Sequence, residues 1–232
     1  MDFNFNLEKS TGTSFNQEKG YVEKFYFLSN KKNIKFLQNE FQGYKWYLKT
    51  VDPEAYKNLK KFKKNKNVIS LRTPVFPGHI FKFWNRNFKN KDIIEKVLNH
   101  YKEVWSFEKK FPPYHGDLTL SNIIFSQKKE VRIIDWEFFE KKQPWGLDIC
   151  NFLISLIALP ALAEKKENLR EEDALTFQLF WRSFFYDDRF EYLENPILFL
   201  KKKTKLAEKN YLTKLSQKLE KNITYLIKDA QK

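Results

Sequence analysis

The chain has 232 residues, of which 43 are Lys or Arg and 29 are Asp or Glu, so its formal net charge is +14. Apolar residues make up 42% of the chain and aromatic residues 18%, which predicts a globular core and excludes an intrinsically disordered protein. The single cysteine, Cys150, excludes an internal disulfide framework, and with only three scattered histidines the chain has no zinc ligand cluster.

The positive charge has two interpretations. A surplus of Lys can indicate an anionic partner such as nucleic acid or a membrane surface. Residues 201–232, however, hold ten Lys against Glu208, Glu220 and Asp229, a surplus of seven and therefore half of the total. We predict this tail to be one amphipathic helix whose lysines are its solvated face. Its apolar stripe comprises Leu206, Leu212, Leu215, Leu219, Ile223 and Leu226.

The sequence predicts a cytoplasmic protein. Its first residues, "MDFNFNLEKS", lack the basic start and apolar core of a signal peptide. The most apolar stretch, "LDICNFLISLIALPAL", is too short for a membrane span and carries Asp148. We therefore expect no membrane span, and the single Cys150 fits a reducing compartment.

The first third of the chain favours strands around a single helix. Residues 1–28 predict strands around a polar turn, because "GYVEKFYFL" is rich in aromatic and β-branched residues. Residues 31–49 predict a helix interrupted only at Gly43, since apolar residues recur every three or four positions. Asp52, Pro53 and Glu54 predict the start of a short Lys-rich helix. Residues 68–84 predict a strand, a turn and a second strand.

The rest of the chain favours helices. One long amphipathic helix is predicted by an apolar stripe from Ile93 to Trp105, and residues after Gly146 are also expected to be helical. Between these lie the short apolar runs "NIIF" and "VRIID", in a hairpin-like pattern. The sequence therefore predicts an α+β fold, with a small N-terminal β-rich lobe (1–83) and a larger, mostly helical C-terminal lobe (84–232).

Two acids and an amide stand out between these helices. Asp117 and Asn122 lie five residues apart in "HGDLTLSN", and Asp135 ends the apolar run "VRIID". Transfer of a phosphoryl group needs a base for the acceptor hydroxyl and oxygen ligands for Mg²⁺. Asp117 can accept the proton, while Asn122 and Asp135 can bind the metal. The alternative is that Asp117 and Asn122 cap turns and Asp135 caps a strand end.

These motifs resemble the catalytic and metal-binding loops of the aminoglycoside phosphotransferase and choline kinase group, small-molecule relatives of the protein kinases. His115, Asp117 and Asn122 match the pattern H-R-D-x-x-x-x-N, with Gly116 in place of Arg. Asp135 takes the position of the D-F-G Asp. The resemblance implies a two-lobed protein-kinase-like fold, ATP or GTP with Mg²⁺ as cofactors, a structural hydrogen bond from His115, and bracing of the catalytic loop by Asp148 in "WGLDICNF".

The resemblance also implies a nucleotide clamp in the first lobe. Lys24 in "YVEKFYF" resembles the final Lys of V-A-I-K and would neutralise charge at the α and β phosphates. Glu40, on the next helix, would hold Lys24 in an ion pair. If "STGTS" is a phosphate-covering loop, the amides of Gly12, Thr13 and Ser14 lie along the phosphates. A polar hairpin turn would have the same sequence.

The segment between Asp135 and Asp148 bears on the substrate. Its twelve residues contain no Ser, Thr or Tyr, which excludes a phosphorylated activation loop there and favours a small-molecule hydroxyl as acceptor. A sugar, an aminosugar and a choline-like amino alcohol all remain candidates. An aromatic and acidic mixture suited to a cationic head group lies further on, although aromatics packed into the core give the same pattern. It comprises Trp181, Phe184, Phe185, Tyr186, Asp187, Asp188 and Tyr192.

The sequence thus predicts a small-molecule kinase and leaves the acceptor and the oligomeric state open. Two alternatives belong to other classes. One is a nucleotide-binding pseudokinase or scaffold, because the glycine loop is degenerate. The other, based on charge alone, is a nucleic-acid-binding protein, whose affinity would fall steeply with salt.

Overall fold

A computed structural model describes residues 2–6, 11–16, 18–80, 91–106, 111–126, 130–185, 195–203 and 211–232. The chain forms two compact units. Unit 1 comprises Met1–His79, Pro113–Gly116 and Ile124–Gln143, and unit 2 comprises Ile80–Pro112, Asp117–Ile123 and Pro144–Lys232. The predicted boundary between residues 83 and 84 lies outside the described residues and stays a prediction.

Unit 1 is built on a five-stranded antiparallel sheet of order β1-β2-β3-β5-β4. The strands are β1 (Asp2–Asn6), β2 (Thr11–Asn16), β3 (Tyr21–Phe27), β4 (Lys60–Lys63) and β5 (Val68–Pro74). The β-branched and aromatic residues of "YVEKFYF" and "VISLRTP" suit these central positions. The strands predicted within residues 1–28 are confirmed. Strand β4, in a segment predicted to be helical, is a correction, and its sequence "KKFK" offers one apolar residue for a sheet edge.

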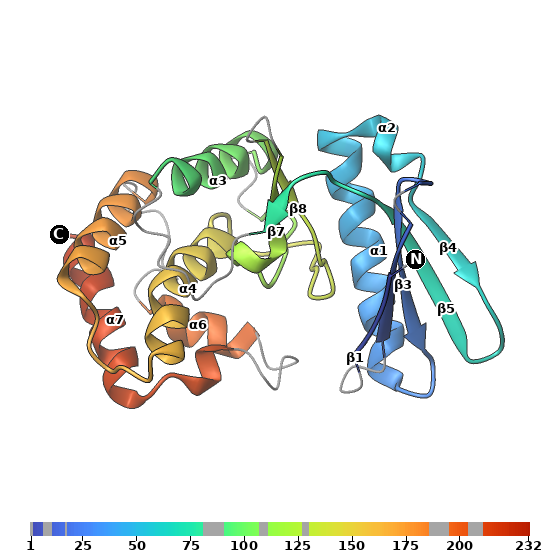
Figure 1. Cartoon of the computed structure of the whole chain (residues 1–232). Coiled ribbons are helices and arrows are strands. Elements are labelled where there is room, and N and C mark those ends of the chain that lie inside the picture. Colours follow the sequence, from blue (N-terminus) through green and yellow to red (C-terminus); the bar gives the residue numbers. More distant parts are fainter. Residues whose placement is uncertain are drawn as a thin grey trace. The chain divides into compact units, whose positions relative to one another are not determined.

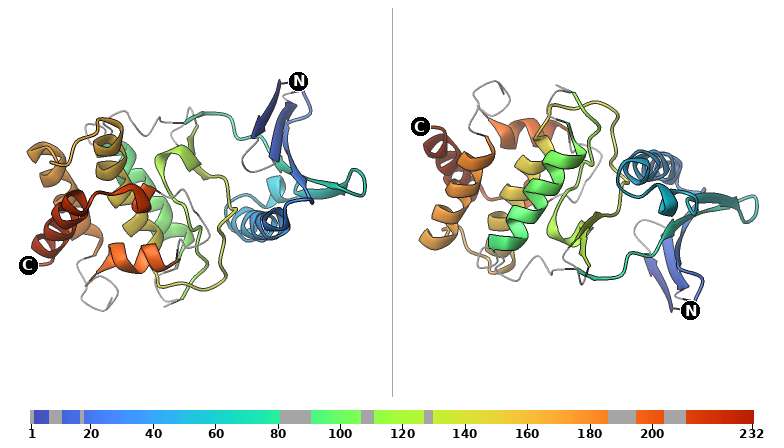
Figure 2. Two further views of the ribbon diagram at one scale, coloured as in Figure 1. Left: turned by 90° about the horizontal axis from the view of Figure 1, so that it is seen from below. Right: turned by 90° about the horizontal axis from the view of Figure 1, so that it is seen from above.

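Helix α1 (Lys31–Val51) packs against this sheet and contacts β3 and β5 (Figures 1 and 2). The side chain of Asn30 caps its start by accepting a hydrogen bond from the amide of Lys32. The predicted helix is confirmed, and it runs through Gly43 without a break. A Cβ at Gly43 would lie 2.5 Å from the Cβ of Trp136, so only glycine allows the helix to approach that ring.

Shorter elements complete unit 1. Helix α2 (Pro53–Tyr56) begins as predicted, with the Asp52 carboxylate accepting from the amide of Ala55. Strands β6 (His79–Ile80), β7 (Ile123–Phe125) and β8 (Val131–Ile133) form a second sheet in the order β6-β7-β8. The hairpin-like pattern predicted for "NIIF" and "VRIID" is therefore confirmed. Residues 113–116 join unit 1 through a bridge between Tyr114 and Glu140.

Unit 2 is helical. Its helices are α3 (Lys91–Val104), α4 (Leu147–Ala163), α5 (Glu171–Phe184), α6 (Pro196–Lys203) and α7 (Gln217–Ala230), with short 3₁₀ turns at η2 (Leu120–Asn122) and η5 (Tyr211–Lys214). Helix α4 is buried along almost its whole length, and α5 lies beside both α4 and α7 (Figure 1). In the part of the chain that the structure describes, no helix is long and apolar enough to cross a bilayer.

The tail differs from its prediction as a single helix. Helix α6 ends at Lys203, residues 211–214 form the 3₁₀ turn η5, and α7 begins at Gln217. Ser216 caps the start of α7, because its hydroxyl accepts a hydrogen bond from the backbone amide of Leu219. The apolar stripe nevertheless faces the core at Leu212, Leu215, Leu219 and Ile223. Leu206 lies outside the described residues.

Candidate active site

The predicted ion pair between Lys24 and Glu40 is confirmed in unit 1. Strand β3 carries Lys24 on the sheet face that α1 covers, and the Nζ atom lies 2.9 Å from Oε2 of Glu40. The same Nζ atom lies 3.0 Å from Oδ1 of Asp135 and 2.6 Å from Oε1 of Glu137. One ammonium group therefore binds three carboxylates from two distant parts of the chain.

Asp135 takes an uncommon backbone conformation. It follows strand β8 with φ of 64°, in the left-handed region that non-glycine residues rarely adopt. The backbone amide of Asp135 donates a hydrogen bond to the Tyr44 hydroxyl at 3.3 Å, and the Asp135 carboxylate binds Lys24. Contacts from α1 and β3 therefore hold this conformation in place. Such retained strain is common at functional sites.

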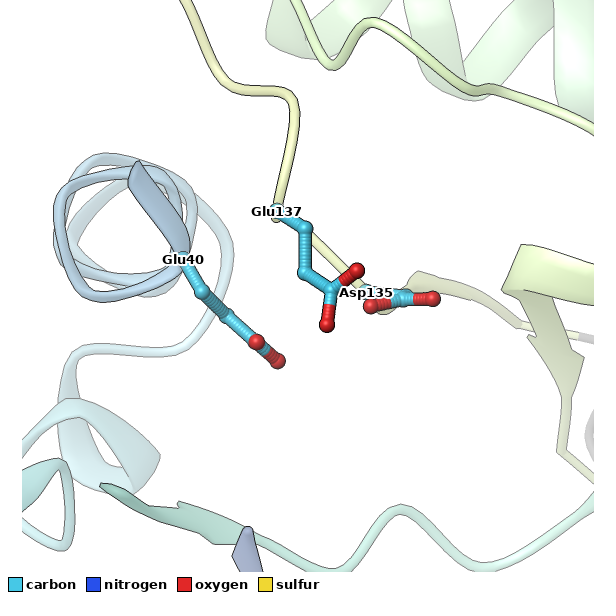
Figure 3. A group of neighbouring side chains, drawn as sticks. All are labelled: Glu40, Asp135 and Glu137. Atoms are coloured by element: carbon cyan, nitrogen blue, oxygen red, sulfur yellow. The ribbon is translucent and has the colours of Figure 1, made fainter. Parts of the chain in front are cut away.

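Glu137 completes the cluster, and sequence reasoning missed its role. The three carboxylates of Glu40, Asp135 and Glu137 converge within 4.8 Å of one another (Figure 3). Glu137 is fully buried, and the Asn39 side chain donates to its backbone carbonyl. The available signal was the second acid in "IDWE", two residues after Asp135.

The charges of this cluster are unbalanced. Burial, together with the carboxylates of Asp135 and Glu137, raises the pKa of Glu40 to about 7, although Lys24 and the Tyr26 hydroxyl lower it. Burial alone would lower the pKa of Lys24, but the carboxylates, Asp135 first, raise it well above its usual range. Lys24 therefore stays charged, while the pKa of Glu40 lies close to neutral pH. The Tyr26 hydroxyl donates a hydrogen bond to Glu40, which favours the ionised form of that carboxyl group.

The donor set fits a phosphate-bound divalent cation. Hard cations such as Mg²⁺ prefer carboxylate oxygens, and three of them gather here beside only one ammonium group. A bound cation would offset the excess negative charge, while the lysine can bind phosphate oxygens. The chemistry of the residues thus suits a metal and nucleotide.

Steric constraints explain why the second residue of the "HGD" motif is glycine. Gly116 has φ of 90°, and a Cβ there would lie 2.5 Å from the carbonyl oxygen of Phe138. A larger residue at this position would clash with the backbone after Asp135.

His115 is buried, and its Nε2 donates to the carbonyl of Ile134 at 2.8 Å. Its ring packs on Trp136, with the ring centres 4.6 Å apart. The predicted structural hydrogen bond of His115 is therefore confirmed, and it supports the residue just before Asp135.

In unit 2, Asp117 and Asn122 lie side by side. The Asn122 amide nitrogen donates to the backbone carbonyl of Asp117 at 2.7 Å and to its Oδ2 at 3.2 Å. Both hydrogen bonds are donated by Nδ2 of Asn122, so its Oδ1 atom points away from Asp117. Oδ1 is therefore the atom of Asn122 that suits a cation. The spacing of five residues is explained by the 3₁₀ turn η2, which brings Asn122 back to Asp117.

A second pair of residues that sequence reasoning missed supports this loop. The Asn151 side chain, on α4, donates to the carbonyl of Leu118 at 3.1 Å. The Tyr211 hydroxyl, on η5, contacts the backbone carbonyl and the Oδ1 atom of Asn151 at 3.1 and 3.0 Å. Asp148, one turn earlier on α4, is fully buried, and its predicted bracing role stays a prediction. No short motif could reveal Tyr211, which lies 60 residues from Asn151.

The predicted phosphate-covering loop is wrong in its placement. Gly12, Thr13 and Ser14 lie within strand β2, paired with β1 on one side and β3 on the other, with Thr13 opposite Lys24. Their backbone groups therefore belong to the sheet. Whether these residues contact phosphates stays a prediction.

Part of the aromatic segment belongs to the core. Trp181, Phe184 and Phe185 are buried and pack on one another. The structure thus supports the core interpretation for these three residues. Tyr186, Asp187, Asp188 and Tyr192 lie outside the described residues.

No protein-family model matches the chain, and no curated protein is significantly similar to it in sequence. Solved structures are similar in fold. A crystal structure of WbdD matches with a TM-score of 0.51 at 15% identity, over 100% of this chain and 50% of WbdD. A second structure, of the bifunctional kinase-methyltransferase WbdD, matches with a TM-score of 0.50 at 16% identity, over 97% of this chain and 48% of that one.

The choline kinase LicA from Streptococcus pneumoniae matches with a TM-score of 0.42 at 14% identity, over 97% of this chain and 94% of LicA. The chain spans about half the length of WbdD, on whose matches the assignment of the fold rests. The expected α+β fold is confirmed, because the chain shares its fold with the bifunctional kinase-methyltransferase WbdD.

Proposed function

We propose that this protein is a phosphotransferase that uses ATP or GTP with Mg²⁺ to phosphorylate a hydroxyl group of a small molecule. The observation that carries the proposal is the Lys24 ammonium, which binds Glu40 and Asp135 in unit 1. The pairing of Asp117 with Asn122 in unit 2 adds support. These are the residues that the kinase motifs select.

Each residue has a task that its chemistry suits. Lys24, held by Glu40, binds phosphate oxygens, and Asp135 and Asn122 offer oxygen ligands to the metal. The carboxylate of Asp117 accepts the proton of the acceptor hydroxyl. The metal-bound nucleotide, when present, supplies the phosphoryl group.

The acceptor is proposed to be a sugar, an aminosugar or a choline-like amino alcohol. The segment from Trp136 to Leu147 contains no hydroxyl residue and is short, which favours a small acceptor over a peptide. The burial of Trp181, Phe184 and Phe185 removes these rings as candidates for holding a cationic head group.

The metal-nucleotide site is tested by thermal shift with ATP or GTP, each with and without Mg²⁺. We expect nucleotide with Mg²⁺ to raise the melting temperature of the wild type and not that of Asp135→Ala, because that variant lacks the carboxylate at the cluster. Glu130→Ala, which removes an exposed carboxylate just before β8, is the matched control and should keep the shift. A full shift in Asp135→Ala would contradict the site.

Transfer is tested with Asp117→Ala. We expect the turnover of a screened acceptor to fall by about 10²- to 10⁴-fold, the usual contribution of a general base, with nucleotide binding retained. Normal turnover by this variant would show that Asp117 is not the base. Nucleotide binding by the wild type without transfer to any acceptor in a broad screen of alcohols would favour the pseudokinase alternative.

A further inference from the structure

A pocket of about 260 Å³ lies in unit 1 on a different face of α1 from Glu40. Helix α1 contributes Gln42, Lys45, Trp46 and Lys49 to its wall. The segment after Asp135 contributes Phe139 and Lys141, and Pro113 closes one side. None of these residues belongs to the carboxylate cluster, so the pocket is separate from the candidate active site.

The charged side chains that line the pocket are all positive. Three lysines line it and no acidic residue does. In the described part of the chain Lys45, Lys49 and Lys141 form no ion pair, although the Lys49 ammonium lies over the Tyr56 ring at 5.1 Å. Lys61, on β4, lies near Lys45, and burial first and this like charge second lower the pKa of Lys61. An anion is the ligand that would relieve this repulsion.

Apart from Gln42, the remaining wall of the pocket is apolar. Trp46 and Pro113 are half-buried and Phe139 is buried, so Trp46 is the aromatic residue with the most surface open to a ligand. Aromatic walls favour planar ligands that can stack on them. The volume is at the small end for ligand sites, which limits the occupant to a small molecule.

The pocket also contacts the back of the carboxylate cluster. The ring centres of Trp46 and Phe139 lie 5.8 and 6.1 Å from that of Trp136. Trp136 is fully buried, and its neighbours in the chain are Asp135 and Glu137. A ligand in contact with Trp46 and Phe139 would therefore affect the position of Trp136, which lies between Asp135 and Glu137 in the chain.

We propose that this pocket binds a small organic anion with a planar ring and a phosphate or carboxylate group, and that its occupancy changes the affinity of the carboxylate cluster for nucleotide. The lysines recognise the charge and the rings recognise the planar part. The second half of the proposal rests on the proposed kinase function, and the first half does not.

Binding is tested by calorimetric titration with 1-naphthyl phosphate at low salt. The pocket variant is Lys45→Ala/Lys49→Ala/Lys141→Ala. The matched control, Lys31→Ala/Lys32→Ala/Lys35→Ala, removes the same charge from exposed positions on the same helix. We expect the dissociation constant to rise at least about tenfold in the pocket variant and to change less than about twofold in the control. Uncharged 1-naphthylmethanol should bind at least about tenfold more weakly than the phosphate.

The position of the ligand is tested by fluorine NMR of protein labelled with 5-fluorotryptophan. The resonance of Trp46, assigned with Trp46→Phe, should shift with the same dissociation constant as the calorimetric signal. The proposed site would be overturned if the pocket variant and the wild type bound 1-naphthyl phosphate with equal affinity. It would also be overturned if calorimetry showed binding while the Trp46 resonance did not shift.

The link to nucleotide is tested by repeating the titration with saturating Mg²⁺ and a non-hydrolysable ATP analogue. Because coupling is reciprocal, the analogue should change the affinity for 1-naphthyl phosphate by the same factor that the probe changes the affinity for the analogue. An unchanged affinity with bound analogue would overturn the link. Failure of the analogue to bind at all would count against the proposed kinase function, while the first titration would still decide the anion site.

Discussion

At the residue scale, the buried His115 makes stability depend on pH. Burial lowers its pKa to about 4, against the usual 6.5, although the hydrogen bond to Ile134 and the charge of Asp135 act the other way. The unfolded chain therefore binds an extra proton between these two pH values. The stabilising effect is complete above pH 6.5 and is lost as the pH falls towards 4, by about 3 kcal/mol in total.

We expect His115→Gln, which can still donate to Ile134, to be less sensitive to acid than the wild type in urea titrations between pH 6.5 and 4. Glu40 acts in the opposite sense, since its raised pKa weakens folding as the pH rises from 4.5 to about 7. Because Glu40 is present in both proteins, the difference between His115→Gln and the wild type does not contain the contribution of Glu40. An unchanged profile in His115→Gln would contradict the prediction.

Residue motifs found part of the site and missed the rest for a physical reason. Asp117, Asn122 and Asp135 stand at fixed spacings in short segments, so a motif can select them. Glu137 differs in kind, because its importance depends on the approach of Lys24, 113 residues earlier in the chain. Folding creates that proximity, and the two-residue spacing from Asp135 in "IDWE" does not by itself report the contact with Lys24.

At the element scale, Tyr211 and Asn151 link η5 and α4 to the loop of Asp117. Removing the Tyr211 hydroxyl leaves buried oxygens of Asn151 without this donor, which costs about 1–3 kcal/mol. We expect Tyr211→Phe to lower the urea midpoint and also kcat, with KM for nucleotide unchanged, because the catalytic loop is then held less firmly. The separation of kcat from KM is the readout that general destabilisation would not give.

Tyr225→Phe is the control for Tyr211→Phe, because Tyr225 on α7 is exposed and the same hydroxyl is removed there. It should change neither quantity. Wild-type kcat in Tyr211→Phe would show that the contact between η5 and α4 does not position the loop.

The elements themselves were predicted where periodicity was strong. Helices α1 and α3 each have an apolar stripe over several turns, and the structure confirms both. Strand β4 was missed because "KKFK" has too few apolar residues to show alternation. The tail sequence predicts one helix because its leucines keep helical spacing across a break, and the Ser216 hydroxyl starts a new helix at that break.

At the scale of the whole molecule, the net charge of +14 governs stability in salt. Repulsion among exposed lysines destabilises the compact state, and salt screens exposed charges far more than buried ones such as Lys24. We expect the urea midpoint at pH 7 to rise between about 20 mM and about 300 mM NaCl, where the screening length shortens severalfold. The same change should have little effect near pH 9.5, where the net charge vanishes. A midpoint that falls with salt at pH 7 would contradict this prediction.

The division of the chain into units was the least predictable feature. Residues 124–143 join unit 1 through contacts such as the Tyr47 hydroxyl with the amide of Ile133, 86 residues apart. Such contacts depend on tertiary packing, and no local pattern in the sequence reports them. The β-rich and helical characters were predicted correctly because they depend on local pattern.

The contact between Gly43 and Trp136 limits how α1 can move. Gly43 is the only glycine in the helix, and a Cβ at the contact point would overlap the ring. Sliding α1 by one turn would bring a bulky residue such as Tyr47 or an acid such as Glu40 to that point. The helix can therefore tilt or lift away from Trp136 but cannot ratchet along it. A shift of α1 along its axis would also carry Glu40 away from Lys24, so the close fit at Gly43 helps to keep the ion pair in register.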